Sequence, residues 1–326
     1  MSTKKENLKY SIGLDLGGTK LAAALVDNRG KIIEYSKFPL ELKKTSSPNA
    51  AKKKVISFMR SACEDYKRRY PVETSKRNFM GIGLASAGPL NVTTGELIDP
   101  SNFPGWRRFK IVKELQISLN ESDWNPKIYF QNDAIAAAYA EKWMGAARDC
   151  KSFVVVTVGT GIGTGVIFNG LPCQTMGMGS EWGHLLIDAK GMQKNDSPIT
   201  EHTVEGIASG TALLKRARAV GFTGNSVEEL VSANEHTHQY KFLFDDMAWA
   251  LASLCYSLSM GFHVDKILFS GGLIKIKNLY WDQTKKIYTD MIRQKNPSFI
   301  APIAVAKAGN KAGVIGAASL PYLLKS

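Results

Sequence analysis

Cysteine is scarce in this 326-residue chain, and the cysteines that are present form none of the usual metal-binding or disulfide patterns. They include no CxxC pair and no cluster with histidine, and they are widely spaced: Cys63, Cys150, Cys173 and Cys255. This spacing predicts reduced thiols in a cytoplasmic protein, without a disulfide framework or a structural zinc site.

Long apolar segments are scarce as well, which bears on secretion and on membrane insertion. Residues 1–9 are polar and basic, and they lack the apolar core of a secretory signal. The only long uncharged run is Met247–Val264, which has the length of a membrane span. Because this run contains several serines and has aspartates on both sides, we interpret it as a buried helix and expect no membrane partner.

Acidic residues are outnumbered, and the excess positive charge is unevenly spread. The chain has 42 lysines and arginines against 29 acidic residues, a net charge of +13, and residues 1–77 carry 18 against 8, or +10 of that total. The densest clusters are Lys52–Lys54 and Lys67–Arg69. A solvated helix face is the favoured interpretation, and a field that attracts anionic ligands is the alternative. Since neither a DNA-reading motif nor an interleaved aromatic pattern accompanies the charge, we expect no nucleic-acid partner.

The most informative feature that is present is a pair of glycine-rich turns, each set between apolar, strand-like runs. The first lies in Ile12–Lys20 (IGLDLGGTK) and the second in Val154–Gly165 (VVVTVGTGIGTG). Glycines let backbone N–H groups approach a bulky anion without an intervening Cβ. Two such turns predict a nucleotide-driven phosphoryl-transfer enzyme whose site lies between two halves of the chain. Either turn by itself is also compatible with an ordinary tight hairpin.

Other nucleotide-binding fingerprints are missing from the sequence. No GxxxxGK[ST] segment occurs, and the alternating glycines of residues 159–165 do not make GxGxxG, so neither a P-loop nor a dinucleotide fold is predicted. Polar residues define the first turn instead. Asp15 can hold Mg²⁺ directly or through water, and Thr19 and Lys20 can donate hydrogen bonds to phosphate oxygens.

Two further groups of polar residues are candidates for chemistry. Asp133 follows Asn132 at the end of a predicted strand, where open α/β sheets place reactive groups. A helix N-cap explains Asp133 equally well, and the two roles are compatible. Glu181 and His184 follow a glycine-rich loop and could bind neighbouring hydroxyl groups, although an ExxH spacing alone is often structural.

The apolar periodicity predicts an α/β protein, and the length favours about two domains. We expect strands on both sides of the second glycine turn and at residues 10–16, 21–26, 31–36, 79–85, 127–131, 267–270 and 303–306. We expect helices from 46–49 to about 70 and over 111–119, 134–144, 204–220, 227–233, 242–264 and 313–324. The expected domains are a small α/β domain, 1–132 plus about 312–326, and a large α/β domain, 133–311.

Five motifs in order along nearly the whole chain resemble the ROK family of sugar kinases, within the actin/hexokinase-like ATPase fold. They are Asp15–Lys20 (DLGGTK), Asn132–Ala134 (NDA), Gly159–Gly163 (GTGIG), Glu181–His184 (EWGH) and Ser270–Gly272 (SGG). Each motif alone is weak, but the five in this order are specific. The resemblance implies a two-domain, ribonuclease H-like α/β fold with a cleft between the domains.

The resemblance also implies an activity and a role for each matching residue. It implies an ATP- and Mg²⁺-dependent hexokinase acting on a 6-hydroxyl group, with glucose as the default substrate, a cytoplasmic location and a homodimer. Asp133 resembles the family's general base. The implied sugar-binding residues are Gly88, Asn102, Asn132, Glu181, His184 and Glu205. The implied nucleotide-binding residues are Asp15, Gly17, Gly18, Thr19, Lys20, Gly159, Thr160, Gly161, Gly163, Gly271 and Gly272.

One departure from the family pattern concerns zinc. Many members carry CxCGxxGC before the last sugar-binding glutamate, and a histidine matching His184 completes their zinc site. Here the cysteine positions fall on Asp196, Pro198 and Thr203, so the resemblance implies that the zinc site is lost. This leaves open how Ala189–His202 keeps its shape and how His184 is oriented.

Three alternative functions remain open at this point. The donor could be inorganic polyphosphate, the chain could be a sugar sensor that has lost catalysis, or it could be an actin-like assembly ATPase. The family's transcriptional regulators carry an N-terminal DNA-binding domain, and because the first predicted strand begins at Tyr10 we expect none in this chain.

Overall fold

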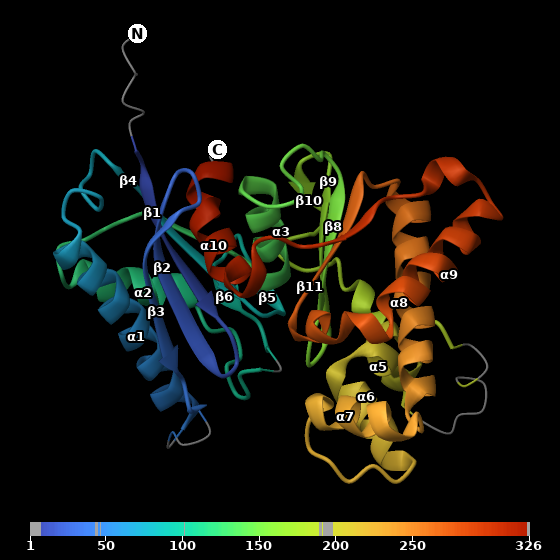
Figure 1. The fold of residues 1–326 in the computed structure, drawn as a ribbon. Helices are drawn as coiled ribbons and strands as arrows, with labels where there is room; N and C mark the ends of the chain where they lie inside the picture. Colours follow the sequence, from blue (N-terminus) through green and yellow to red (C-terminus); the bar gives the residue numbers. More distant parts are fainter. Residues whose placement is uncertain are drawn as a thin grey trace. The chain divides into compact units, whose positions relative to one another are not determined.

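The computed structural model describes residues 8–42, 45, 47–100, 102–188, 191 and 198–324. Contacts between Cα atoms divide the chain into two units, both drawn in Figure 1. The first unit comprises residues 1–149, 174–179 and 310–326, and the second comprises residues 150–173 and 180–309. The first unit includes helix α3 (Asp133–Trp143), whereas the expected boundary runs at residue 132.

A five-stranded sheet in the order β3-β2-β1-β4-β7 forms the centre of the first unit. Its strands are β1 (Tyr10–Leu16), β2 (Lys20–Asp27), β3 (Ile32–Pro39), β4 (Phe79–Ser86) and β7 (Ile128–Asn132). The first three form the expected antiparallel meander, and β4 and β7 continue the sheet in parallel with β1. A separate short hairpin consists of β5 (Leu90–Asn91) and β6 (Glu96–Leu97).

Helices cover both faces of this sheet, as Figure 1 shows. Besides α3 they are α1 (Pro48–Arg69), α2 (Ile111–Asn120) and α10 (Ala312–Leu323). Successive side chains of a strand point to opposite faces. Accordingly Ile12 and Leu14 of β1 lie in the core shared with α1, whereas Gly13 between them contacts α10. On β4, a Cβ at Gly83 would lie only 1.8 Å from the carbonyl oxygen of Ala317. The small residues of the sheet therefore let the α10 backbone pack directly on it.

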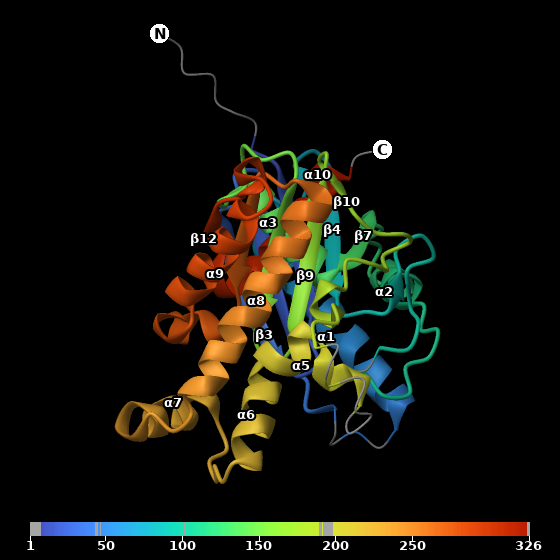
Figure 2. The same cartoon turned by 90° about the vertical axis from the view of Figure 1, so that its right-hand side faces the viewer.

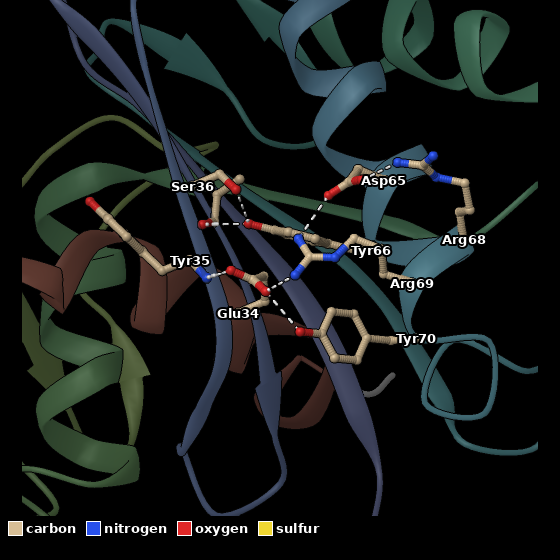
Figure 3. Close-up of polar contacts among 9 residues, drawn as sticks. Glu34, Tyr35, Ser36, Asp65, Tyr66, Arg68, Arg69 and Tyr70 are labelled. Carbon is tan, nitrogen blue, oxygen red and sulfur yellow. Dashed lines mark hydrogen bonds and ion pairs between the residues drawn. The ribbon is translucent and has the colours of Figure 1, made fainter.

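The basic cluster at the C-terminal end of α1 is held in ion pairs, which Figure 3 shows. The Arg69 guanidinium lies 2.6 Å from the carboxylate of Glu34 on β3 and 3.1 Å from that of Asp65. Arg68 lies 2.6 Å from the other oxygen of Asp65, and the Tyr70 hydroxyl donates to Glu34 at 2.7 Å. Arg69 and Tyr70 thus fasten the end of the helix to the edge strand, whereas Arg68 pairs within α1. Both arginines are held by carboxylates, which supports the structural interpretation of the cluster.

The Tyr66 hydroxyl is buried between α1 and the sheet, where it donates to the carbonyl oxygen of Ala23 at 3.0 Å and lies 3.0 Å from Ser36 Oγ. Because burial raises the pKa of Tyr66, the hydroxyl stays protonated and remains a donor. We expect Tyr66→Phe to lower the free energy of unfolding by about 1–2 kcal/mol, measured by urea denaturation. Tyr70→Phe, at a less buried ring, is the matched control and is expected to cost less. Equal stability of Tyr66→Phe and the wild type would contradict this role.

A second five-stranded sheet, in the order β10-β9-β8-β11-β12, forms the centre of the second unit. Its strands are β8 (Phe153–Val158), β9 (Ile162–Phe168), β10 (Leu171–Pro172), β11 (Lys266–Ser270) and β12 (Ile303–Val305). Strands β8 and β9 form the expected antiparallel hairpin around the second glycine turn. Strands β11 and β12 continue the sheet in parallel with β8.

Helix α8 (Lys241–Phe262) lies in the core of the second unit, and Figure 2 shows it as the long orange helix. Leu251, Cys255 and Leu258 are fully buried there. Most of the uncharged run is therefore helical and packed into the core, as expected, although Trp249 and Met260 are exposed and the helix ends at Phe262. Within the described part of the chain, no helix combines the length and apolar character needed to cross a membrane.

The helix expected over 204–220 is interrupted. The structure has α5 (Val204–Ala208) and α6 (Gly210–Ala219), separated by Ser209 in an extended conformation. The Ser209 hydroxyl caps α6 by accepting a hydrogen bond from Ala212 N at 3.2 Å. Serine competes with helical hydrogen bonding in this way, so a break is favoured where the first N–H groups of a new helix find other partners.

The remaining helices of the second unit include one that the sequence analysis does not expect. They are α7 (Val227–Thr237), α9 (Trp281–Arg293) and short 3₁₀ helices at Trp182–His184, Ile199–His202, Gly272–Leu279 and Pro297–Phe299. Another short 3₁₀ turn, Gly309–Lys311, precedes α10. The unexpected helix is α9, in which Thr284, Tyr288 and Ile292 are buried at a spacing of four residues. That spacing marks one helical face and is the signal that could have identified it.

Candidate active site

In the first unit, three parallel strands end side by side. Leu16 at the end of β1 pairs with Ser86 at the end of β4, which in turn pairs with Asn132 at the end of β7. The carboxyl ends of parallel strands are where open α/β sheets bind ligands. The first glycine turn, the loop after Ser86 and the start of α3 all leave the sheet at this edge.

The first glycine turn is a tight connection from β1 to β2. Gly17 N donates to the carbonyl oxygen of Lys20 at 3.0 Å, and Leu40 N donates to that of Thr19 at 3.0 Å. Asn102 lies beside this turn. A Cβ atom added at Gly18 would be 3.3 Å from the Cβ atom of Asn102. The structure therefore brings one expected sugar-binding residue next to the expected phosphate-binding turn.

Asp15 lies near the end of β1, against the first turn of α10. A Cβ atom added at Gly313 of α10 would lie only 2.4 Å from Asp15 Oδ2. The absence of a side chain at Gly313 therefore leaves space for the Asp15 carboxylate. The pKa of Asp15 is raised to about 6, mainly by burial and also by the negative charge of Asp133, against the opposing charge of Lys20. Asp15 and Asp133 thus lie close enough to influence each other, although they are far apart in the sequence.

Asp133 is the first residue of α3, and its neighbour performs the capping. Asn132 Oδ1 accepts hydrogen bonds from Ala134 N at 2.9 Å and Ile135 N at 3.3 Å. Asp133 Oδ1 accepts from Ala134 N at 2.8 Å. Burial raises the pKa of Asp133, and the bond from Ala134 N opposes that rise. The N-cap role considered for Asp133 is therefore performed by Asn132, and the Asp133 carboxylate accepts hydrogen bonds from the adjacent backbone.

The loop after β4 lies next to the same residues. A Cβ at Gly88 would be 3.6 Å from Asn132 Nδ2. Gln131, which is buried, accepts hydrogen bonds through Oε1 from Asn132 N at 2.7 Å and from Gln174 Nε2 at 2.9 Å. Gln174 was not expected to belong to this region, because its chain segment follows β10 and no local sequence pattern links it to Asn132.

In the second unit, the turn between β8 and β9 is held by the residues around the start of α6. Gly159 N donates to the carbonyl oxygen of Gly161 at 2.9 Å, which closes the turn. Gly210 N donates to the carbonyl oxygen of Gly159 at 2.8 Å, and Thr211 Oγ1 donates to that of Thr160 at 2.8 Å. The break at Ser209 is what directs these groups toward the turn.

The turn with the expected nucleotide-binding residues Gly271 and Gly272 lies against the end of β8. Gly271 has a φ of +98°, and a Cβ there would lie 2.3 Å from the carbonyl oxygen of Val158. Only glycine combines this backbone conformation with so close an approach. The Gly271–Gly272 turn and the Gly159–Gly163 segment are therefore neighbours in the second unit.

Glu181 and His184 lie at the two ends of a 3₁₀ turn, with both residues exposed. Thr164 on β9 brackets Glu181, since its buried hydroxyl donates to the carbonyl oxygen of Ser180 and accepts from Trp182 N at 3.0 Å. No sequence signal distinguishes Thr164 from any other threonine in a strand. Its role follows only from the packing of β9 against the segment that carries Glu181.

Glu205, expected as a sugar-binding residue, contacts the second glycine turn. Its Oε2 accepts a hydrogen bond from Ile162 N at 2.7 Å. A Cβ at Gly161 would lie 2.6 Å from the same oxygen. The sequence analysis does not predict this contact, because the two residues lie 43 positions apart.

The described residues around the missing zinc motif are tied by hydrogen bonds. The buried His202 ring lies 3.0 Å from Asp188 Oδ2, and Gly191 N donates to Asp188 Oδ1 at 2.9 Å. Thr203 caps α5, since its hydroxyl accepts from Gly206 N at 3.0 Å. Asp196, the first of the replaced cysteine positions, lies outside the described residues.

Two α/β units with these glycine turns define a protein of the actin/hexokinase-like ATPase fold. The model of the ROK family matches residues 11–322, so the chain belongs to the ROK family, as the sequence motifs predict.

Similar proteins include several sugar kinases. The chain is 28% identical over 328 residues to a glucokinase of Thermotoga maritima, covering 95% of this chain and 96% of the relative. It is 28% identical to an N-acetylmannosamine kinase of Haemophilus influenzae, over 94% of this chain and 93% of the relative. Among solved structures, a ROK hexokinase from Thermus thermophilus matches with a TM-score of 0.79 and 28% identity, over 97% of this chain and 98% of that one.

Proposed function

We propose that this protein is a sugar kinase that transfers the γ-phosphoryl group of ATP to the 6-hydroxyl group of a hexose, with glucose as the first candidate. The observation that carries the proposal is the Asp15–Asp133 pair at the edge where β1, β4 and β7 end. Two findings support the proposal: the chain belongs to the ROK family, and the proteins similar to it include sugar kinases.

In this proposal Asp133 is the general base. A sugar hydroxyl is a poor nucleophile near neutral pH, and a carboxylate placed beside it can accept its proton as the new bond to phosphorus forms. Partial burial favours this role, because a higher pKa makes the carboxylate a stronger base. The Asn132 cap fixes the first turn of α3 and with it the position of the Asp133 backbone.

The first glycine turn and Asp15 are proposed to bind the phosphate groups and Mg²⁺. Carboxylate oxygens are ligands that Mg²⁺ prefers, and Asp15 fits that role because its pKa of about 6 leaves it ionised at neutral pH. The ion would offset negative charge on the phosphoryl group. The turn Gly17–Lys20 would contribute the backbone N–H groups of Gly18 and Thr19 and the Lys20 ammonium.

Sugar recognition is proposed to involve the polar residues that the family resemblance implies. Specificity is strong where a site is built to bind hydroxyl groups, because a missing hydroxyl leaves the protein group without a partner. The proposed ligands are Gly88, Asn102, Asn132, Glu181, His184 and Glu205.

The proposal is tested by ADP release from Mg·ATP with a panel of sugars and a control without sugar. The panel contains glucose, mannose, fructose and N-acetylmannosamine, and a parallel arm replaces ATP with long-chain polyphosphate. Release with one or two sugars would identify the substrate. Sugar-independent release would indicate an ATPase, and sugar binding without release would indicate a sensor.

We also propose that the protein is a homodimer, a state that the family resemblance implies. Multi-angle light scattering of the purified chain tests this directly. A mass of one chain, 35.7 kDa, across the working concentration range would contradict it.

A further inference from the structure

Three segments of the second unit form a closed circuit of hydrogen bonds. The first is β9, whose Thr164 brackets Glu181 through the neighbouring peptide groups. The second runs on from Glu181 to Asp188 and pairs with residues 202–204, where Val204 N donates to Leu185 O at 3.0 Å. The third is the start of α5, and the bond from Ile162 N to Glu205 leads back to β9. Three proposed sugar ligands therefore lie on one connected framework.

The same framework holds the second glycine turn. The carbonyl oxygen of Gly159 accepts a hydrogen bond from Gly210 N, and that of Thr160 accepts one from Thr211 Oγ1. At the end of the turn, Ile162 N donates to the Glu205 carboxylate. Residues 205–211 thus supply the contacts at the start, the middle and the end of the turn. Among these contacts, the one from Glu205 is the only one made by a carboxylate.

We propose that Glu205 is a positioning residue for the second glycine turn and that it thereby couples sugar binding to nucleotide binding. The inference rests on the proposed function, in which Glu205 binds sugar, and on the nucleotide-binding role that the family resemblance implies for this turn. A hydrogen bond from a backbone N–H to an ionised carboxylate is stronger than one between neutral groups. One carboxylate oxygen holds the turn, so a sugar hydroxyl at the other would act on the same group.

The proposed coupling is positive and can be measured, because each ligand is expected to strengthen binding of the other. A sugar that fixes the Glu205 side chain lowers the cost of ordering the turn for nucleotide, and by linkage a bound nucleotide improves sugar binding by the same factor. A role in sugar binding alone makes a different prediction, because nucleotide affinity measured without sugar would then be independent of Glu205.

The test is the dissociation constant of Mg·AMPPNP, a non-hydrolysable ATP analogue, measured by calorimetry without sugar. We expect Glu205→Ala to weaken it by about 10- to 100-fold, the range for losing a hydrogen bond to a charged group. Glu205→Gln is expected to fall between Glu205→Ala and the wild type, because its amide oxygen can still accept from Ile162 N. Glu201→Gln is the matched control: Glu201 lies four residues earlier and pairs with Lys215, and its substitution is expected to leave the constant unchanged.

Unchanged AMPPNP affinity in Glu205→Ala, together with weaker sugar binding, would overturn the inference and leave Glu205 as a sugar ligand only. That result would leave the kinase proposal intact, whereas a wild type that neither binds AMPPNP nor releases ADP would contradict the kinase proposal itself. If Glu205→Ala does not fold, the AMPPNP dissociation constants of Glu205→Gln and Thr211→Val test the inference in its place. Thr211→Val removes the hydroxyl bond to Thr160 from an exposed position, and both variants must weaken AMPPNP binding for the inference to stand.

Discussion

Asp133→Asn is expected to lower kcat by about 10²–10⁴-fold while the sugar dissociation constant changes little. Asparagine has the shape of aspartate, and its side-chain oxygen can still accept the hydrogen bond from Ala134 N. It cannot take up the proton of the sugar hydroxyl. The expected result is therefore a folded protein that binds sugar and turns over slowly, as measured by ADP release and by calorimetry with the sugar.

Stability provides an internal check on Asp133→Asn. Because burial disfavours the ionised form of Asp133, a neutral side chain of the same size is expected to leave the melting temperature unchanged or raise it. Asp149→Asn, at an exposed position of the same unit, is the matched control for activity and should match the wild type. Loss of sugar binding with normal turnover per bound sugar would assign Asp133 to recognition instead of proton transfer.

Asp15→Asn is expected to lower activity by at least about 10²-fold at saturating sugar, the scale on which single charge-stabilising groups act in enzymes. The physical reason is loss of the proposed carboxylate ligand for Mg²⁺ beside the first glycine turn. The decisive measurement is ADP release over a wide range of Mg²⁺ concentrations. Wild-type activity at every concentration would exclude Asp15 from the metal and phosphate site.

The raised pKa of Asp15 adds a pH dependence with a definite sign. The folded-state value of about 6 exceeds the ordinary value of 3.8, so between these pH values the folded protein binds more protons than the unfolded chain. The contribution of Asp15 to stability therefore falls as the pH rises through this window, by at most about 1.4 kcal/mol per pH unit. Activity is expected to rise over the same interval, because the ionised carboxylate is the form that binds Mg²⁺.

Urea unfolding of the wild type and Asp15→Asn between pH 4.5 and 7.5 tests this effect. Titrating groups that do not interact with Asp15 are common to both proteins and cancel in the difference between their unfolding free energies. The difference therefore reports Asp15 together with Asp133, whose charge acts on it. The wild type is expected to lose stability relative to Asp15→Asn as the pH rises. A difference that is independent of pH would show that Asp15 titrates alike in the folded and unfolded chains.

Local patterns were sufficient for much of the fold. Apolar runs separated by turn residues predicted the opening meander and the hairpin around the second glycine turn, and the helix that contains the uncharged run. Periodicity of this kind is a property of neighbouring residues, so the sequence records it directly. Helix α9 carries such a signal too, in the spacing of Thr284, Tyr288 and Ile292.

The family and the identity of the candidate residues were also determined by the sequence, because glycine turns and the acids beside them are short motifs. The catalytic, sugar-binding and nucleotide-binding roles given to those residues stay predictions.

Only the tertiary structure decided which groups meet. It placed Asp15 and Asp133 at the same edge of the first sheet. It assigned the cap of α3 to Asn132 and broke a predicted helix at Ser209, where Gly210 holds the second turn. It also joined Glu205 to Ile162, a contact that no spacing in the sequence indicates. The physical reason is that hydrogen bonds and desolvation depend on distances between segments remote in the chain, whereas local propensity reports only on a residue and its near neighbours.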